Sequence, residues 1–244
     1  MKNPLIIIAI VILVIVAYDA IRIFFLSQKT ATLEQSPFNR KIRNAIFRIL
    51  VLGDSTAVGI GAERPEDSTA GRLAQLYPGA EVINLAMSGQ RISGLEEILA
   101  KREDEHFDIV LIQIGANDII RLTSMEDIES GIESILTRSK KFGGKIIFLH
   151  SGNVGDAKFF PWYVRPILSK RSLQVRDIYK RKASVHGVLY VDLIDSQVSE
   201  KFKESPDLYY ASDLLHLSSE GYALWYEEIA NKLQADGNES GREQ

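Results

Sequence analysis

The sequence predicts an α/β fold in which a parallel β-sheet is covered by helices on both faces. Short apolar runs alternate with longer amphipathic segments from residue 48 to residue 235. The short runs, such as Ile109–Ile114 (IVLIQI), are almost continuously apolar, which is typical of strands buried on both faces. Polar residues follow several of these runs. In such sheets, binding and catalytic residues lie at the carboxyl ends of the strands.

The first element is an apolar segment, and we expect residues 1–26 to form a membrane-spanning helix. Leu5–Ala17 is a run of thirteen apolar residues, and apolar side chains continue to Leu26. A helix from Leu5 to Leu26 is roughly 33 Å long, enough to cross a hydrocarbon core of ~30 Å. A helix buried in a protein core is disfavoured because the run leaves no polar face. Asp19 and Arg22 can pair on one face near its end.

A cleaved signal peptide is the alternative interpretation of this segment. Cutting after Ala17 would place Ile15 at the −3 position, and cutting after Ala20 would place Tyr18 there, whereas signal peptidase sites need small residues. We therefore favour an uncleaved anchor. The basic residues that follow the segment outnumber Lys2 before it, which favours a cytoplasmic domain, and an exported domain behind a signal anchor stays open.

Residues 27–47 are expected to form a basic connector, with a short helix over 37–47, before a domain over residues 48–235. Five strands are expected there: Ile49–Leu52, Val82–Leu85, Ile109–Ile114, Ile146–Leu149 and Val188–Val191. Five helices are expected around them: Ser68–Leu76, Ser93–Arg102, Met125–Lys141, Pro166–Val185 and a last helix with Tyr222, Trp225, Ile229 and Leu233 on one face. Residues 236–244 are polar and should form a flexible tail.

Composition excludes several classes of function. The 244 residues include no cysteine, which rules out disulfides, thiolate nucleophiles and cysteine-ligated metals. The 29 Lys and Arg residues against 32 Asp and Glu residues argue against a nucleic-acid partner. A Walker A motif, a His-Glu-x-x-His motif and a complete dinucleotide fingerprint are absent from the sequence, so we expect neither a metal nor a cofactor. A Gly-x-Ser-x-Gly elbow is absent too, which argues against an ordinary α/β-hydrolase.

The polar residues near the expected strand ends are suited to acyl transfer. Ser55 follows the first strand, and a serine hydroxyl becomes a strong nucleophile only when a base takes its proton. His216 is a suitable base, and Asp213, three residues earlier, can accept its other ring N–H. The backbone N–H groups of Ser55 and Gly89, with the side chain of Asn117, are candidate donors to the developing oxyanion.

These residues resemble the four ordered sequence blocks of the SGNH hydrolases, also called GDSL esterases and lipases. The matching blocks are Gly53-Asp54-Ser55, the segment Asn84–Gly89, Gly115-Ala116-Asn117-Asp118, and Asp213-Leu214-Leu215-His216. The resemblance covers about residues 47–235. Departures are Thr56 after the serine, and Leu214 and Leu217 where the family often has glycine and proline, which leaves substrate preference open.

The resemblance implies a three-layer α/β/α sandwich with a five-stranded parallel sheet, of the flavodoxin-like SGNH type. It implies metal-free hydrolysis of an ester or thioester, with Ser55, Asp213 and His216 as catalytic residues. Ser55, Gly89 and Asn117 would form the oxyanion hole. The expected partners are a small-molecule or lipid ester and, through the N-terminal helix, a membrane.

Two other functions fit parts of the sequence. In a metal-dependent phosphoesterase, Asp54, Asn117 and Asp118 would supply oxygen ligands, although histidines are missing near the first and third strands. A non-catalytic membrane-anchored binding protein is the third possibility, and the complete catalytic set argues against it. Asp54 and Asp118 are more simply explained as residues that order turns.

Two further features stay open from the sequence. The aromatic run Phe159–Tyr163 forms either a satellite hydrophobic cluster or a lid or acyl-binding wall beside Ser55, in which case Trp162 would set chain-length preference. His150 ends a strand and is expected to be structural, although its position allows an approach to the site.

Overall fold

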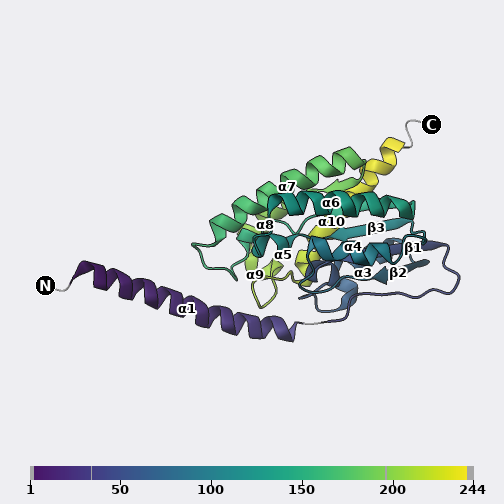
Figure 1. Cartoon of the computed structure of the whole chain (residues 1–244). Coiled ribbons are helices and arrows are strands. Elements are labelled where there is room, and N and C mark those ends of the chain that lie inside the picture. Colours follow the sequence, from purple (N-terminus) through teal and green to yellow (C-terminus); the bar gives the residue numbers. More distant parts are fainter. Residues whose placement is uncertain (1–2, 34, 196, 241–244) are drawn as a thin grey trace.

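The computed structural model, which describes residues 3–33, 35–195 and 197–240, shows a long N-terminal helix followed by an α/β domain (Figure 1). All strands of the central sheet are parallel and lie in the order β2-β1-β3-β4-β5. The strands are β1 (Phe47–Gly53), β2 (Ala80–Asn84), β3 (Ile109–Gln113), β4 (Lys145–Leu149) and β5 (Leu189–Val191). The predicted fold class is therefore confirmed, and each of the five expected strands is present.

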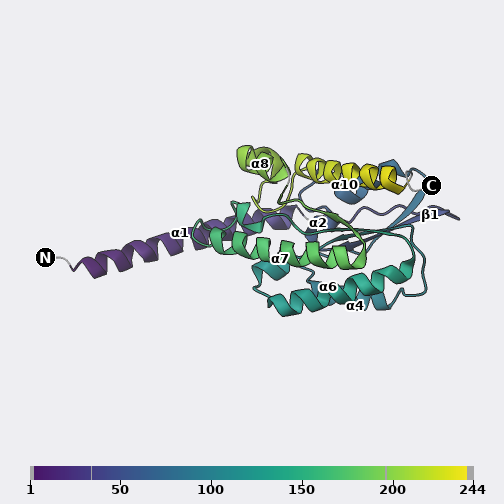
Figure 2. The same cartoon turned by 90° about the horizontal axis from the view of Figure 1, so that it is seen from above.

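The helices connect these strands and cover both faces of the sheet, as Figure 2 shows for α10 on one side and α4, α6 and α7 on the other. They are α1 (Pro4–Thr32), α2 (Ser55–Val58), α3 (Thr69–Leu76), α4 (Ile92–Ala100), α5 (Ala116–Ile120), α6 (Met125–Ser139), α7 (Arg165–His186), α8 (Gln197–Glu204), α9 (Pro206–Tyr209) and α10 (Ser219–Ser240). Single 3₁₀ turns occur at Pro65–Asp67, Lys140–Phe142 and Val154–Asp156.

Alternate side chains of each central strand enter two different cores. In β1, Ile49 and Val51 pack with α3 and α10, whereas Leu50 and Leu52 pack with α4, α6 and α7. All four are at most 1% exposed. This two-sided burial explains why the strands are continuous apolar runs in the sequence.

Two expected features at the ends of the domain differ from the structure. Residues 37–47 contain no helix, because Arg40 forms an antiparallel bridge with Val82 at the outer edge of β2. The guanidinium of Arg40 donates to the carbonyls of Ala74, Tyr77 and Ala80, which fixes this segment in an extended path. At the other end, α10 continues to Ser240, and residues 241–244 of the expected tail lie outside the described residues.

Helix α1 projects from the domain over its first half and packs against it over its second half (Figure 1). The apolar side chains from Leu5 to Val16 are exposed. Asp19, Arg22, Leu26 and Thr30 recur every three or four residues and therefore share one face of the helix. Asp19 and Leu26 are buried, and Arg22 donates hydrogen bonds to backbone carbonyls of the domain. This face holds α1 against the domain next to the loop that precedes α7.

Candidate active site

Ser55 lies on the turn between β1 and α2, and the sequence around it fixes this turn. The backbone of Gly53 has a φ of 151°, and a Cβ atom there would lie 1.8 Å from the carbonyl oxygen of Gln113. Glycine is therefore required for β1 to approach β3 at this point. The buried Asp54 carboxylate accepts hydrogen bonds from the N–H and hydroxyl of Thr56 and caps α2, so Asp54 orders the turn.

Ser55, His216 and Asp213 form a continuous chain of hydrogen-bonded side chains. The hydroxyl oxygen of Ser55 lies 3.0 Å from Nε2 of His216, and Nδ1 of His216 lies 2.6 Å from Oδ2 of Asp213. Both distances are within the range for hydrogen bonds. The expected nucleophile, base and orienting carboxylate thus lie in the order that acyl transfer requires.

The backbone around Asp213 holds its carboxylate in a fixed orientation. Oδ1 accepts hydrogen bonds from the N–H groups of Leu215 and His216, and the side chain is fully buried. Burial by itself would raise the pKa of Asp213, but the hydrogen bonds from His216 and from these two N–H groups lower it to about 2. Asp213 is therefore ionised at neutral pH. The next residue, Leu214, has a φ of 61°, a conformation that favours glycine, so the turn stores strain.

The expected oxyanion donors border the same cavity as Ser55 and His216. This cavity has a volume of about 420 Å³ and is lined by Ser55, Gly89, Asn117 and His216, with apolar walls that include Phe202 and Trp225. Within the described residues, the N–H groups of Ser55 and Gly89 and the side chain of Asn117 make no hydrogen bond to the protein. Gly89 has a φ of 78°, which a glycine adopts without strain.

The sequence from residue 51 to residue 224, more than two thirds of the chain, matches the GDSL-like Lipase/Acylhydrolase family. The chain belongs to this family. Its members are ester-hydrolysing enzymes, and the four blocks of the SGNH hydrolases all lie within the matched residues.

Other known proteins are similar to this chain in sequence or in fold. A GDSL-like esterase of Mycobacterium tuberculosis is 23% identical over 197 residues, which cover 77% of this chain and 62% of that protein. The chain thus spans less than two thirds of this relative. Among solved structures, TesA gives a TM-score of 0.61 at 20% identity over 77% of this chain and 98% of TesA. An acetylxylan esterase from Geobacillus stearothermophilus gives 0.56 at 20% identity, over 77% and 94% of the two chains.

The carboxylates proposed as metal ligands in the phosphoesterase alternative have other partners. Asp54 binds Thr56, and Oδ2 of the buried Asp118 accepts a hydrogen bond from the N–H of Ile92 at the start of α4. Burial raises the pKa of Asp118, against the effect of this bond. Among the residues that the structure describes, no cluster of three or more His, Asp or Glu side chains is arranged to hold a metal ion. Within the described part of the chain, Asp54 and Asp118 therefore order backbone turns through these hydrogen bonds.

The structure bears on the two features that the sequence left open, His150 and the aromatic run. His150 is buried, its Nδ1 accepts a hydrogen bond from the N–H of Gly152, and burial lowers its pKa to about 4. It is therefore a neutral core residue in this GDSL domain. In the aromatic run, Phe160 packs against the core that contains Leu50 and Leu52, whereas Trp162 is 72% exposed and does not line the cavity, so Trp162 is not a wall for the acyl group.

Sequence reasoning missed the contribution of α1 to the site. The hydroxyl of Thr30 donates to Oδ2 of Asp213 at 2.9 Å, the same oxygen that accepts the ring N–H of His216. Ser27, Thr30 and Ala31 also line the cavity. The two partners of this hydrogen bond are 183 positions apart in the chain. The spacing of Thr30 from Leu26 and Arg22 is the only sign in the sequence that this face of α1 packs against protein.

Proposed function

We propose that this protein is a membrane-anchored serine esterase that hydrolyses a carboxylic ester or thioester through an acyl-enzyme on Ser55. The observation that carries the proposal is the hydrogen-bonded chain from Ser55 through His216 to the ionised Asp213. The test is hydrolysis of p-nitrophenyl acetate together with labelling of Ser55 by a fluorophosphonate. Activity that is lost on chelation and a serine that stays unlabelled would instead support the metal-dependent alternative.

The reaction follows from the geometry in two halves. The Ser55 oxygen attacks the acyl carbon while Nε2 of His216 takes the hydroxyl proton, and Asp213 stabilises the resulting imidazolium. His216 then returns this proton to the leaving alcohol or thiol as its bond to the acyl carbon breaks. Water attacks the acyl-enzyme in the second half, His216 again takes the proton, and the acid leaves as the Ser55 oxygen is reprotonated.

Ser55, Gly89 and Asn117 are proposed to bind the oxyanion that forms in both halves. Their N–H groups border the cavity without protein acceptors among the described residues, so they are available to a developing negative charge. Donors fixed by the backbone need little reorganisation when the charge appears.

Replacing Asn117 with alanine should lower kcat about 10²–10³-fold, because one oxyanion donor is lost. The change removes no hydrogen bond within the described structure, so the melting temperature should change little. Steady-state kinetics on p-nitrophenyl acetate and a thermal melt measure the two effects. A kcat within twofold of wild type would show that Asn117 is not an oxyanion donor.

Replacing Thr30 with valine should lower kcat roughly tenfold, because a hydrogen bond to a charged group is worth ~1.5–3 kcal/mol and Asp213 keeps its two backbone donors. Valine preserves the branched shape, so KM for a short ester should stay within about twofold. Thr30→Ser, which restores the hydroxyl, should recover most of the activity. A serine variant as slow as the valine variant would show that Thr30 acts through packing alone.

The membrane anchor is proposed for α1. Its free half is apolar and exposed, and the described chain contains this one helix that is long and apolar enough to cross a bilayer. The packing of Asp19, Arg22 and Thr30 on the domain supports a helix that stays attached to the mature protein. Mass spectrometry of the mature protein tests this, because a first residue beyond 17 would identify a cleaved signal peptide.

A further inference from the structure

The length of the free half of α1 is too short to span a membrane alone. Residues 4–18 precede the first contact with the domain and rise roughly 22 Å, against a hydrocarbon core of ~30 Å. About five more residues are needed, and these lie where α1 already packs on the domain. If α1 spans a bilayer, the domain must therefore sit directly against the membrane.

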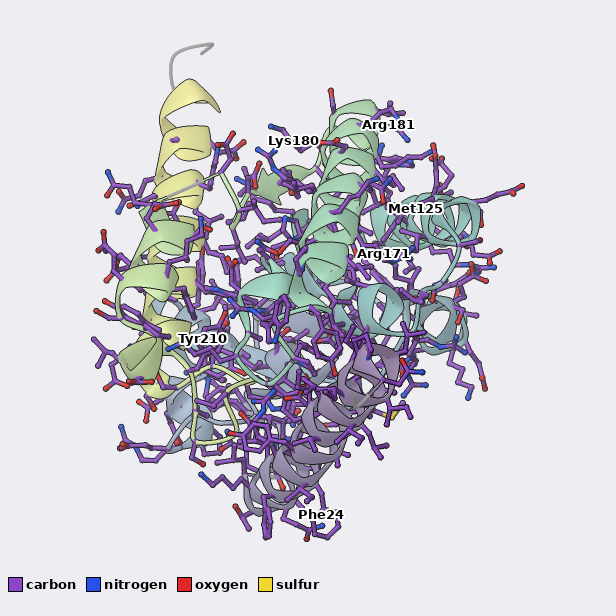
Figure 3. All side chains as sticks on the ribbon, turned by 90° about the vertical axis from the view of Figure 1, so that its left-hand side faces the viewer. Phe24, Met125, Arg171, Lys180, Arg181 and Tyr210 are labelled. Atoms are coloured by element: carbon purple, nitrogen blue, oxygen red, sulfur yellow. The ribbon has the colours of Figure 1, made fainter. Side chains whose placement is uncertain are left out.

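The outer face of the packed half of α1 is also apolar. Ile21, Phe24 and Phe25 are 59%, 59% and 62% exposed, on the side opposite to the face that contacts the domain. Figure 3, viewed from the side of the free half of α1, shows Phe24 pointing away from the domain. A span from Pro4 to Phe25 rises roughly 33 Å, which matches the hydrocarbon core. Lipid would cover these three side chains, which are otherwise exposed to water.

A second apolar element lies beside this part of α1. It is the loop Phe159–Tyr163, which we call the aromatic loop. Arg22 donates hydrogen bonds of 2.8 and 2.9 Å to the carbonyls of Lys158 and Phe159. Desolvation and, after it, the neighbouring Asp19 carboxylate raise the pKa of Tyr163. Figure 1 shows the loop before α7 as the part of the domain that extends furthest along the free half of α1. Trp162 is therefore held beside the end of the apolar span, where tryptophan and tyrosine are favoured in membrane proteins.

The residues of α1 that line the catalytic cavity come directly after this span. Ser27, Thr30 and Ala31 line the cavity and lie two to six residues beyond Phe25, which is roughly 3–9 Å along the helix axis. This distance places the cavity in the headgroup layer when Phe25 lies at the edge of the hydrocarbon.

We propose that the aromatic loop inserts into the membrane interface beside α1 and that the catalytic cavity therefore takes its substrate from the bilayer. The substrate class is the acyl ester of a membrane amphiphile, whose ester group lies near the headgroups while its chain stays in the hydrocarbon. This inference rests on the proposed anchor and on the proposed serine esterase activity.

Fluorescence of the full-length protein in phosphatidylcholine vesicles tests the insertion. The chain has two tryptophans, and Trp225 is buried, so the variant Trp225→Phe reports on Trp162 alone. Lipid brominated near the top of its acyl chains should quench this emission, and aqueous iodide should have little effect. Strong quenching by iodide with none by brominated lipid would overturn the proposal.

A kinetic comparison tests the consequence for the substrate. Trp162→Ser should lower the ratio of activity on a long-chain ester in vesicles to activity on p-nitrophenyl acetate roughly tenfold, because an aromatic side chain is lost from the interface. Val185→Ser is the matched control, because Val185 is 73% exposed at the opposite end of α7. This variant should keep the wild-type ratio of the two activities. Equal ratios for the two variants would overturn the proposal. A wild-type protein inactive on p-nitrophenyl acetate would instead refute the esterase function.

Discussion

Replacing Ser55 with alanine should lower kcat for p-nitrophenyl acetate by about 10⁴–10⁶-fold, because the nucleophilic oxygen, which also accepts the acyl group, is lost. His216 and the oxyanion donors remain in the variant. They cannot form an acyl-enzyme, so the residual rate reflects only attack by water on the bound ester.

The same variant should lose labelling by a fluorophosphonate, which reacts with an activated serine. Ser130→Ala is a suitable control, since Ser130 is an exposed serine on α6 whose hydroxyl donates to the Asp127 carbonyl. It should be labelled and should hydrolyse the ester as the wild type does. If Ser55→Ala kept the wild-type rate, with a melting curve that shows a folded protein, the proposed mechanism would be wrong.

The sheet was predictable from the sequence because its physical cause is local. A strand buried on both faces must be apolar at nearly every position, so β1, β3 and β4 are visible as short apolar runs. The short helices α2, α5 and α9 leave no such signal, since four or five residues cannot show a helical period, and the eight-residue α8 was not predicted either. Their positions depend on turns, such as the Asp54 cap on α2, and on contacts with the finished sheet.

The residues of the site were predictable in part for a related reason. Ser55, Gly89 and Asn117 follow strands, and parallel strands bring their carboxyl ends to one edge. Asp213 and His216 are three residues apart, so their pairing is also local. Thr30 was missed because its contact with Asp213 depends on how α1 packs on the domain, and an apolar helix gives no sequence signal for its partner. The expected helix over residues 37–47 was wrong for a similar reason, since the pairing of Arg40 with β2 is a tertiary contact.

Replacing Asp213 with asparagine should lower kcat by about 10⁴-fold, although the two side chains have the same shape. The fall in kcat follows from the hydrogen bonds that each carboxylate oxygen of Asp213 accepts. Oδ1 accepts from two backbone N–H groups, so the asparagine must place its carbonyl oxygen there and its amide NH₂ at the position of Oδ2. The amide then donates to Nδ1 of His216, which holds the ring proton on Nε2. In that tautomer Nε2 cannot take the proton from Ser55.

Nitrogen NMR of the histidine side chains would identify the protonated ring nitrogen in wild type and variant at a pH where His216 is neutral. We expect protonation at Nδ1 in the wild type and at Nε2 in Asp213→Asn. Wild-type activity in the variant, or an unchanged tautomer with a 10⁴-fold loss, would contradict this account of Asp213.

The Asp213→Asn background also isolates the contribution of Thr30. In the wild type, the Thr30 hydroxyl donates to the charged oxygen that holds His216. Losing this hydroxyl should therefore destabilise the transition state. With an amide at that position, the hydroxyl no longer supports a carboxylate, and Thr30→Val should cost little beyond the first substitution. The two single effects should therefore be strongly non-additive, as expected for residues that act as one unit. Additive effects in this double-mutant cycle would show that α1 influences the rate by a route other than Asp213.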